Sequence, residues 1–179
     1  MSKHVELRGE GFTVKRPDQG RSRNLLALAG WLLVSFVASG IGSIASVNAR
    51  SFYQELERPA WAPPGWAFGP VWTTLFALMG IAAWLVWREQ GWRRARGALS
   101  LFILQLGVNA LWSWLFFAWR LGSVAIADVL LLWVLILATI VAFWRVKPLA
   151  GVLLVPYLIW VTYASALTIW IVQHNPQVL

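Results

Sequence analysis

Long apolar runs separated by short polar segments dominate the chain. Five runs contain almost no charged side chains, and they cover residues 25–46, 70–87, 98–119, 123–144 and 148–172. About 18 to 24 apolar residues in a helix are enough to cross the roughly 30 Å hydrocarbon core of a membrane. The pattern therefore predicts an all-α integral membrane protein whose residues 25–174 form a five-transmembrane-helix bundle.

The segments between these runs are polar or rich in helix breakers. Residues 1–24 form a basic tail with no sustained apolar period, which predicts disorder. A signal peptide has an apolar core of about 7 to 15 residues, so the first run is too long to be one. Residues 47–69 contain Pro63-Pro64-Gly65, which forbids one continuous helix, and a short basic loop is expected between the second and third runs.

Composition agrees with a membrane location and excludes several classes of function. Apolar residues make up 59% of the 179 residues and charged residues 12%, so a soluble enzyme is excluded. The absence of cysteine excludes disulfides and thiolate chemistry. The net charge of +8 could indicate a nucleic-acid partner, but the basic residues lie at the ends of the apolar runs and are expected to anchor the protein in a lipid bilayer.

Basic residues also predict the orientation of the spans. Twelve of the 15 Lys and Arg residues lie in the N-terminal tail and in the second and fourth connections, counted from the first span. Short positively charged loops stay in the cytoplasm. In a bacterium the N-terminus is therefore expected inside, with the Trp-Pro loop outside.

Helical spacing places aromatic and amide side chains on three stripes. Residues three, four or seven positions apart share a face of a helix. The stripes are Trp72 with Phe76, then Gln105, Asn109, Trp112 and Phe116, and finally Trp160, Ala164 and Leu167, which follow a helix-kinking Pro156. If the stripes converge, they form an aromatic box for a flat, mostly apolar molecule. The amides of Gln105 and Asn109 must then pair across helices or with a ligand.

Simpler interpretations stay open for the same residues. Tryptophans near the ends of the runs are expected in the interfacial belt or in packing, and core packing can also explain Trp72, Trp112 and Trp160. Asp128 is the one acidic residue inside a span, and it is either a functional carboxylate or a structural hydrogen-bonding group, a role also open to Gln105. Ala38, Gly42 and Ser46 indicate a close helix-packing face.

No catalytic or metal constellation stands out. His4 and His174 are far apart in the sequence, and the spans contain no Ser-His-Asp set, carboxylate pair or phosphate loop. A metal site and hydrolytic chemistry are therefore not expected, and no cofactor is required.

Four sequence segments resemble the translocator protein family, also called tryptophan-rich sensory proteins or peripheral-type benzodiazepine receptors. The first is Phe52-Tyr53-Gln54-Glu55-Leu56-Glu57-Arg58-Pro59-Ala60-Trp61 with the following Ala62-Pro63-Pro64-Gly65-Trp66. The others are Gly69-Pro70-Val71-Trp72 with Gln105-Leu106-Gly107-Val108-Asn109-Ala110-Leu111-Trp112-Ser113, and Val155-Pro156-Tyr157-Leu158-Ile159-Trp160. The similarity covers about residues 28 to 173.

The resemblance implies a five-helix bundle, commonly a homodimer, that binds protoporphyrin IX or haem, synthetic benzodiazepine-type ligands and in some members cholesterol. It implies ligand-binding roles for Tyr53, Trp61, Trp72, Phe76, Asn109, Trp112, Phe116, Trp160, Ala164 and Leu167. Three features depart from the family pattern. No basic residue follows Lys147, so the family's cholesterol-recognition pattern is incomplete; Phe116 stands where some bacterial relatives carry an amide; and the basic tail is long.

Three functions are compatible with these features. The first is a membrane tetrapyrrole-binding sensor or transporter, in which the Trp-Pro-Pro loop caps the pocket. The second is light- or oxygen-dependent porphyrin breakdown, with Trp72 and Trp160 as the redox-active side chains. The third is a regulatory membrane protein that binds lipid or sterol passively.

Overall fold

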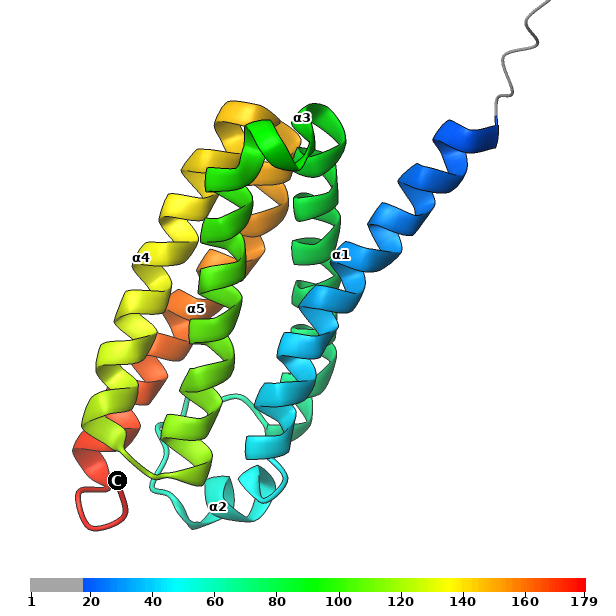
Figure 1. Cartoon of the computed structure of the whole chain (residues 1–179). Coiled ribbons are helices and arrows are strands. Elements are labelled where there is room, and N and C mark those ends of the chain that lie inside the picture. The colour runs from blue at the N-terminus through cyan, green and yellow to red at the C-terminus, as the bar shows by residue number, and fades with distance from the viewer. Residues whose placement is uncertain (1–17) are drawn as a thin grey trace, which may run out of the picture.

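The computed structural model describes residues 18–179, and every regular element in this part of the chain is helical (Figure 1). Four long helices are α1 (Asp18–Ala45), α3 (Phe68–Ser113), α4 (Gly122–Val146) and α5 (Pro148–His174). Between α1 and α3 lie the short helix α2 (Ala49–Glu55) and a 3-10 turn, η1 (Gly65–Ala67), and a π-helical turn, η2 (Trp114–Ala118), extends α3. The four long helices are long and apolar enough to cross a membrane.

The helix α3 is folded back on itself and supplies two of the five spans. Its backbone stays helical from residue 88 to residue 97, so the predicted loop there is wrong; only Gly91, at φ 68° and ψ 174°, leaves the helical region. That conformation is open essentially to glycine alone. The two arms then run side by side, since Gln105 Nε2 lies 3.9 Å from Met79 Sδ (Figure 1). The predicted five-span, all-α fold is confirmed.

Two other predicted boundaries differ from the structure. The polar tail was expected to reach residue 24, but α1 begins at Asp18, and its polar first turns place the exposed Arg21 and Arg23 beyond the apolar run. The expected disorder of the tail otherwise falls on residues 1–17, outside the described residues. The segment 47–69 is not wholly a loop, because it contains the short helix α2, which buries Phe52 and Tyr53; the buried Leu56 follows as the extended C-cap residue.

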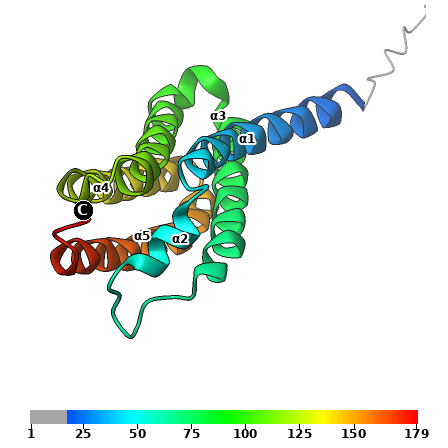
Figure 2. The same ribbon diagram turned by 90° about the horizontal axis from the view of Figure 1, so that it is seen from below.

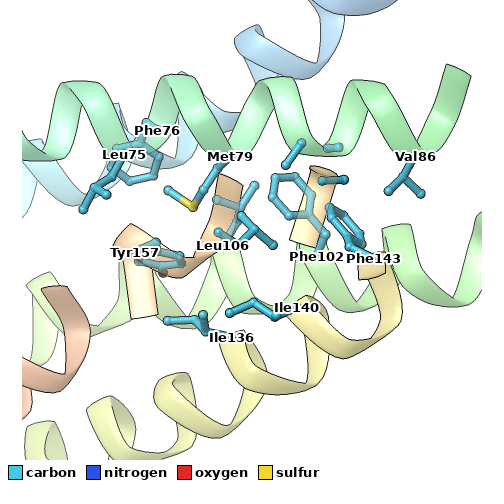
Figure 3. Packing of buried hydrophobic residues seen from close by; sticks show 14 of the residues in the cluster. Leu75, Phe76, Met79, Val86, Phe102, Leu106, Ile136, Ile140, Phe143 and Tyr157 are labelled. Atoms are coloured by element: carbon cyan, nitrogen blue, oxygen red, sulfur yellow. The ribbon is translucent and has the colours of Figure 1, made fainter. Parts of the chain in front are cut away.

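The main core lies between the two arms of α3, α4 and α5 (Figure 3). Met79 from the first arm, Phe102 from the second and Phe143 from α4 are fully buried. The rings of Phe102 and Phe143 lie 5.7 Å apart, centroid to centroid. Large side chains from all of these spans therefore interlock in one cluster, which holds the bundle together.

The first span, α1, packs chiefly on α3 through small residues. A Cβ atom added to Gly80 would lie 3.0 Å from the Leu32 Cα atom, and one added to Gly42 would lie 3.1 Å from Ser113 Oγ. Ala38 is also buried, which supports the small-residue packing face predicted for α1. The N-terminal half of α1 leans away from the bundle (Figures 1 and 2) and exposes Leu25, Leu26 and Leu33.

Candidate functional site

A buried polar triad joins the second arm of α3 to α5. The Asn109 Nδ2 group donates to the Tyr157 hydroxyl at 2.9 Å, and that hydroxyl donates to Gln105 Oε1 at 3.0 Å. Gln105 and Tyr157 are 1% exposed and Asn109 7%. The cross-helix pairing expected for the two amides is thus made by Tyr157, a residue that helical spacing did not single out. A buried tyrosine hydroxyl normally has a partner, which is the signal that could have identified it.

Aromatic rings from α3 and α5 meet on one side of this triad. The ring of Trp72 lies 5.6 Å from Phe76 and 6.2 Å from Tyr157. Trp160, one turn after Tyr157, lies 5.9 Å from Phe68 at the start of α3. Offset and edge-to-face pairs at such distances are favourable. Trp72, Phe76 and Trp160 therefore share one wall that belongs to the main core.

A second aromatic group lies under α2. Trp112 and Phe116 stack with centroids 5.2 Å apart and planes 11° from parallel, and Phe52 of α2 meets Phe116 edge-on at 6.1 Å. Tyr53 and Leu167 are buried in the same cluster, and Trp112 packs against both this cluster and the main core. Ala164 is half-buried on α5. The predicted site residues thus form two adjoining groups, with Trp112 between them.

The segment between α1 and α3, residues 46–67, is tied to the bundle by side-chain hydrogen bonds, and we call it the lid. Asn175 accepts from the Glu57 amide at 2.8 Å and donates to the Glu57 carbonyl at 3.0 Å. Tyr163 of α5 donates to the Trp61 carbonyl at 2.8 Å, and within the lid Tyr53 donates to the Pro63 carbonyl at 3.3 Å. The roles of Tyr163 and Asn175 were not predicted. These bonds close the end of the bundle that the lid covers.

Tyr53 carries the one titration of interest outside the spans. Burial raises the pKa of its hydroxyl above the ordinary value, and the guanidinium of Arg58, whose Cζ atom lies 4.8 Å from the ring centroid, offsets part of the rise. The hydroxyl therefore stays protonated at neutral pH and keeps donating to Pro63. Trp61, also on the lid, is 48% exposed, and its ring meets Tyr163 at 5.6 Å.

Among residues 18–179, three buried side-chain polar atoms have no hydrogen-bond partner in this part of the chain. They are Trp112 Nε1, Trp160 Nε1 and Asp128 Oδ2. Asp128 is 8% exposed on α4. Buried polar groups are normally paired, so these atoms remain available to a ligand or to water. In the described part of the chain, no group of three or more His, Asp or Glu residues could hold a metal ion.

The aromatic side chains fill much of the space between the stripes, and two adjoining clefts lie on the seam between the first arm of α3 and α5. The larger cleft, of about 450 Å³, is lined by Pro63, Val71, Leu75, Pro156, Ile159, Trp160 and Tyr163. The smaller, of about 290 Å³, shares Val71, Leu75 and Pro156 with it. Trp160 is the one predicted site residue on this seam.

Comparison with known proteins agrees with this architecture. The model of the TspO/MBR family matches residues 27–173. The tryptophan-rich protein TspO of Chlorobaculum tepidum is 39% identical over 158 residues, which cover 87% of this chain and 99% of that protein. The human translocator protein is 40% identical over 126 residues, 69% of this chain and 75% of its own. The tryptophan-rich sensory protein of Cereibacter sphaeroides is 36% identical over 149 residues, 81% of this chain and 92% of its own.

The family match extends from Ala27, in the third turn of α1, to Gln173, the last residue but one of α5. It therefore includes the lid, the polar triad and both aromatic groups. The match is longer than any single motif and agrees with the five-span fold. This multi-pass membrane protein belongs to the TspO/MBR family.

Proposed function

We propose that the protein binds a planar tetrapyrrole, such as protoporphyrin IX or haem, between its two aromatic groups and acts as a membrane sensor or transporter of that molecule. The observation that carries this proposal is the pair of unpartnered indole N–H groups, Trp112 Nε1 and Trp160 Nε1, in an otherwise apolar aromatic wall. A flat ring system stacks on indoles, and polar atoms at its edge accept their hydrogen bonds.

The ligand replaces contacts that the protein makes with itself. Trp112 stacks on Phe116 in the present structure, at the ring separation that a bound aromatic plane would adopt. The lid segment covers this group with Phe52 and Tyr53, whereas Trp61 lies against Tyr163. Binding thus involves displacement of one ring from the other, whereas the triad of Gln105, Asn109 and Tyr157 has its hydrogen bonds satisfied and stays in place.

Titration of the purified protein with protoporphyrin IX tests the proposal. Trp72→Ala and Trp160→Ala should each weaken binding about tenfold or more, since a factor of ten corresponds to about 1.4 kcal/mol and lost burial adds to lost stacking. Trp144→Ala is the matched control, because Trp144 is 49% exposed on α4 and lies outside both aromatic groups.

Absorbance recorded in the dark, in light and without oxygen separates binding from porphyrin breakdown. Saturable binding with no loss of porphyrin absorbance over time supports a sensor or transporter. If Trp72→Ala and Trp160→Ala both bind porphyrin as the parent does while staying folded, these tryptophans serve packing and the proposal fails.

We also propose that the end of the bundle carrying the α3 corner faces the cytoplasm. Arg88, Arg93, Arg94 and Lys147 lie at this end, as the distribution of basic loops predicts for the inner side of a bacterial membrane. Reporter fusions at residue 5 and residue 178 should report opposite sides. The homodimer that the family resemblance implies stays a prediction, which crosslinking in intact membranes tests.

A further inference from the structure

We propose that the cleft between the first arm of α3 and α5 is the entry site through which a flat apolar ligand passes from the membrane to the aromatic groups. This inference rests on the proposed function. It concerns the route of the ligand, and it assigns Trp160 as the side chain that separates the entry cleft from the interior.

The cleft opens toward the hydrocarbon core of the bilayer. Ile159 and Tyr163 lie in the middle third of the 27-residue α5, and Pro156 directly precedes it. Ile159 is 65% exposed, whereas Leu75 on the opposite wall is 4% exposed. A membrane-spanning helix presents such exposed apolar residues to lipid. The cleft therefore leads from the lipid surface of the protein to a buried wall of the bundle.

Its size and chemistry suit a membrane-dissolved aromatic molecule. A volume of about 450 Å³ lies within the range of small-molecule sites, and the lining is almost wholly apolar. The few polar groups nearby are on Tyr163, which already donates to the Trp61 carbonyl, and on Trp160, whose buried Nε1 has no partner. An occupant with a hydrogen-bond acceptor at its edge would satisfy that indole.

The lid closes the alternative route, by which a ligand would enter from the aqueous phase. Asn175 holds the Glu57 backbone through two hydrogen bonds, and Phe52 and Leu56 are buried at 3% and 4% exposure. Opening the lid breaks these bonds and exposes both side chains. Moving Trp160 breaks no hydrogen bond, because its indole is held by packing alone.

The helix is also least constrained beside the cleft. Pro156 has no amide hydrogen, so the carbonyl four residues earlier loses its helical partner and α5 can bend at this point. Trp160 follows Pro156 by one turn and contacts both Phe68 and Tyr163, at 5.9 and 5.7 Å. A rotation of Trp160 away from Phe68 would join the cleft to the wall that also contains Trp72.

Stopped-flow binding of protoporphyrin IX from lipid vesicles to the full-length protein in nanodiscs tests the route. Val71→Phe narrows the cleft at a half-buried position that lines both of its parts. A blocked entrance slows arrival and departure alike, so the association and dissociation rates should both fall about tenfold while the equilibrium Kd changes less than twofold. Val134→Phe is the matched control, because Val134 is 56% exposed on α4 outside the cleft and should change neither rate.

Asn175→Ala supplies the opposite test, since it loosens the lid at Glu57. The lid residue that lines the cleft, Pro63, lies further along the chain, where the hydrogen bond from Tyr163 to the Trp61 carbonyl is kept. Entry from the membrane predicts unchanged rates for this variant. Faster binding by Asn175→Ala together with normal rates for Val71→Phe would overturn the inference and establish the aqueous route. Saturable binding with unaffected rates in Val71→Phe refutes the entry route alone, whereas no saturable binding in the parent protein refutes the proposed function as well.

Discussion

The main core and the aromatic group under the lid are both buried, yet they are built differently. In the main core, rings alternate with aliphatic side chains from α3, α4 and α5, and the one polar cluster, Gln105, Asn109 and Tyr157, is hydrogen-bonded. Under the lid, rings stack on rings, as in Trp112 with Phe116. The indole N–H of Trp112 is left without a partner there, as is that of Trp160 at the edge of the main core. The first arrangement specifies one packing. In the second, a flat ligand can take the place of one of the two stacked rings.

The largest effect should come from emptying the main core. Phe102 is fully buried between Phe143 and Trp31, with ring centroids 5.7 and 6.0 Å away. Phe102→Ala should lower the free energy of unfolding by about 3 to 5 kcal/mol. Equilibrium unfolding in detergent measures this change in free energy. Phe117→Ala, at a half-buried ring in the lid group, should cost less than half as much, and equal losses would remove the distinction between the two regions.

A smaller loss of stability should follow from breaking the polar triad. Tyr157→Phe keeps the ring against Trp72 but removes the hydroxyl, so Asn109 Nδ2 and Gln105 Oε1 lose the partner they share. Leaving buried polar groups unpaired costs about 1 to 3 kcal/mol. Thermal unfolding and porphyrin titration should show lower stability with affinity changed only a few-fold. Loss of affinity at unchanged stability would instead place the triad in the ligand site.

The lid should respond locally to loss of its clamp. Asn175→Ala removes both hydrogen bonds to the Glu57 backbone, each contributing about 1 kcal/mol. Amide hydrogen exchange should accelerate in residues 56–62 and stay unchanged in the second arm of α3. Gln177→Ala, an exposed position in the same C-terminal turn, is the control. Uniform acceleration through the bundle would show that the lid supports the whole fold.

The smallest effect concerns pH and Tyr53. Burial raises the pKa of the folded hydroxyl above 10, so on an open lid the same group ionises at a lower pH. The contribution of Tyr53 to closure is therefore complete below about pH 10 and is lost as pH rises through the folded pKa. Exchange of the lid amides, corrected for intrinsic rates, should show this loss in the parent and not in Tyr53→Phe. An identical pH dependence of exchange in the parent and in Tyr53→Phe would show that the Tyr53 hydroxyl does not help to hold the lid closed.

Sequence patterns predict the spans well because hydrocarbon imposes length and apolarity on each of them separately. The stripes followed from helical spacing, and the contacts of Trp72 with Phe76 and of Trp112 with Phe116 are contacts within one helix or its direct extension. Tyr157, Tyr163 and Asn175 were missed because their partners lie 48 to 118 residues away, where no local period indicates pairing.

The corner of α3 was missed for a different reason. Its arginines suggested a solvated loop, but Arg, Glu, Gln and Ala are all strong helix formers. A polar helical turn in the interfacial region satisfies its own backbone, so charge and helix are compatible there. Glu89 also pairs with Lys147 at 3.1 Å, a half-exposed contact that links this corner to the turn between α4 and α5.

The single non-helical residue in that corner, Gly91, makes the two arms of α3 one rotational unit. Helix continues on both sides of it, so there is no slack to absorb a change in chain length. Inserting one residue into the helical segment after Gly91 would turn every side chain beyond it by about 100° about the helix axis. Gln105 and Asn109 would then face away from Tyr157. The corner therefore sets the phase of the amide and aromatic stripe, and natural length variation should be found in the lid and the termini instead.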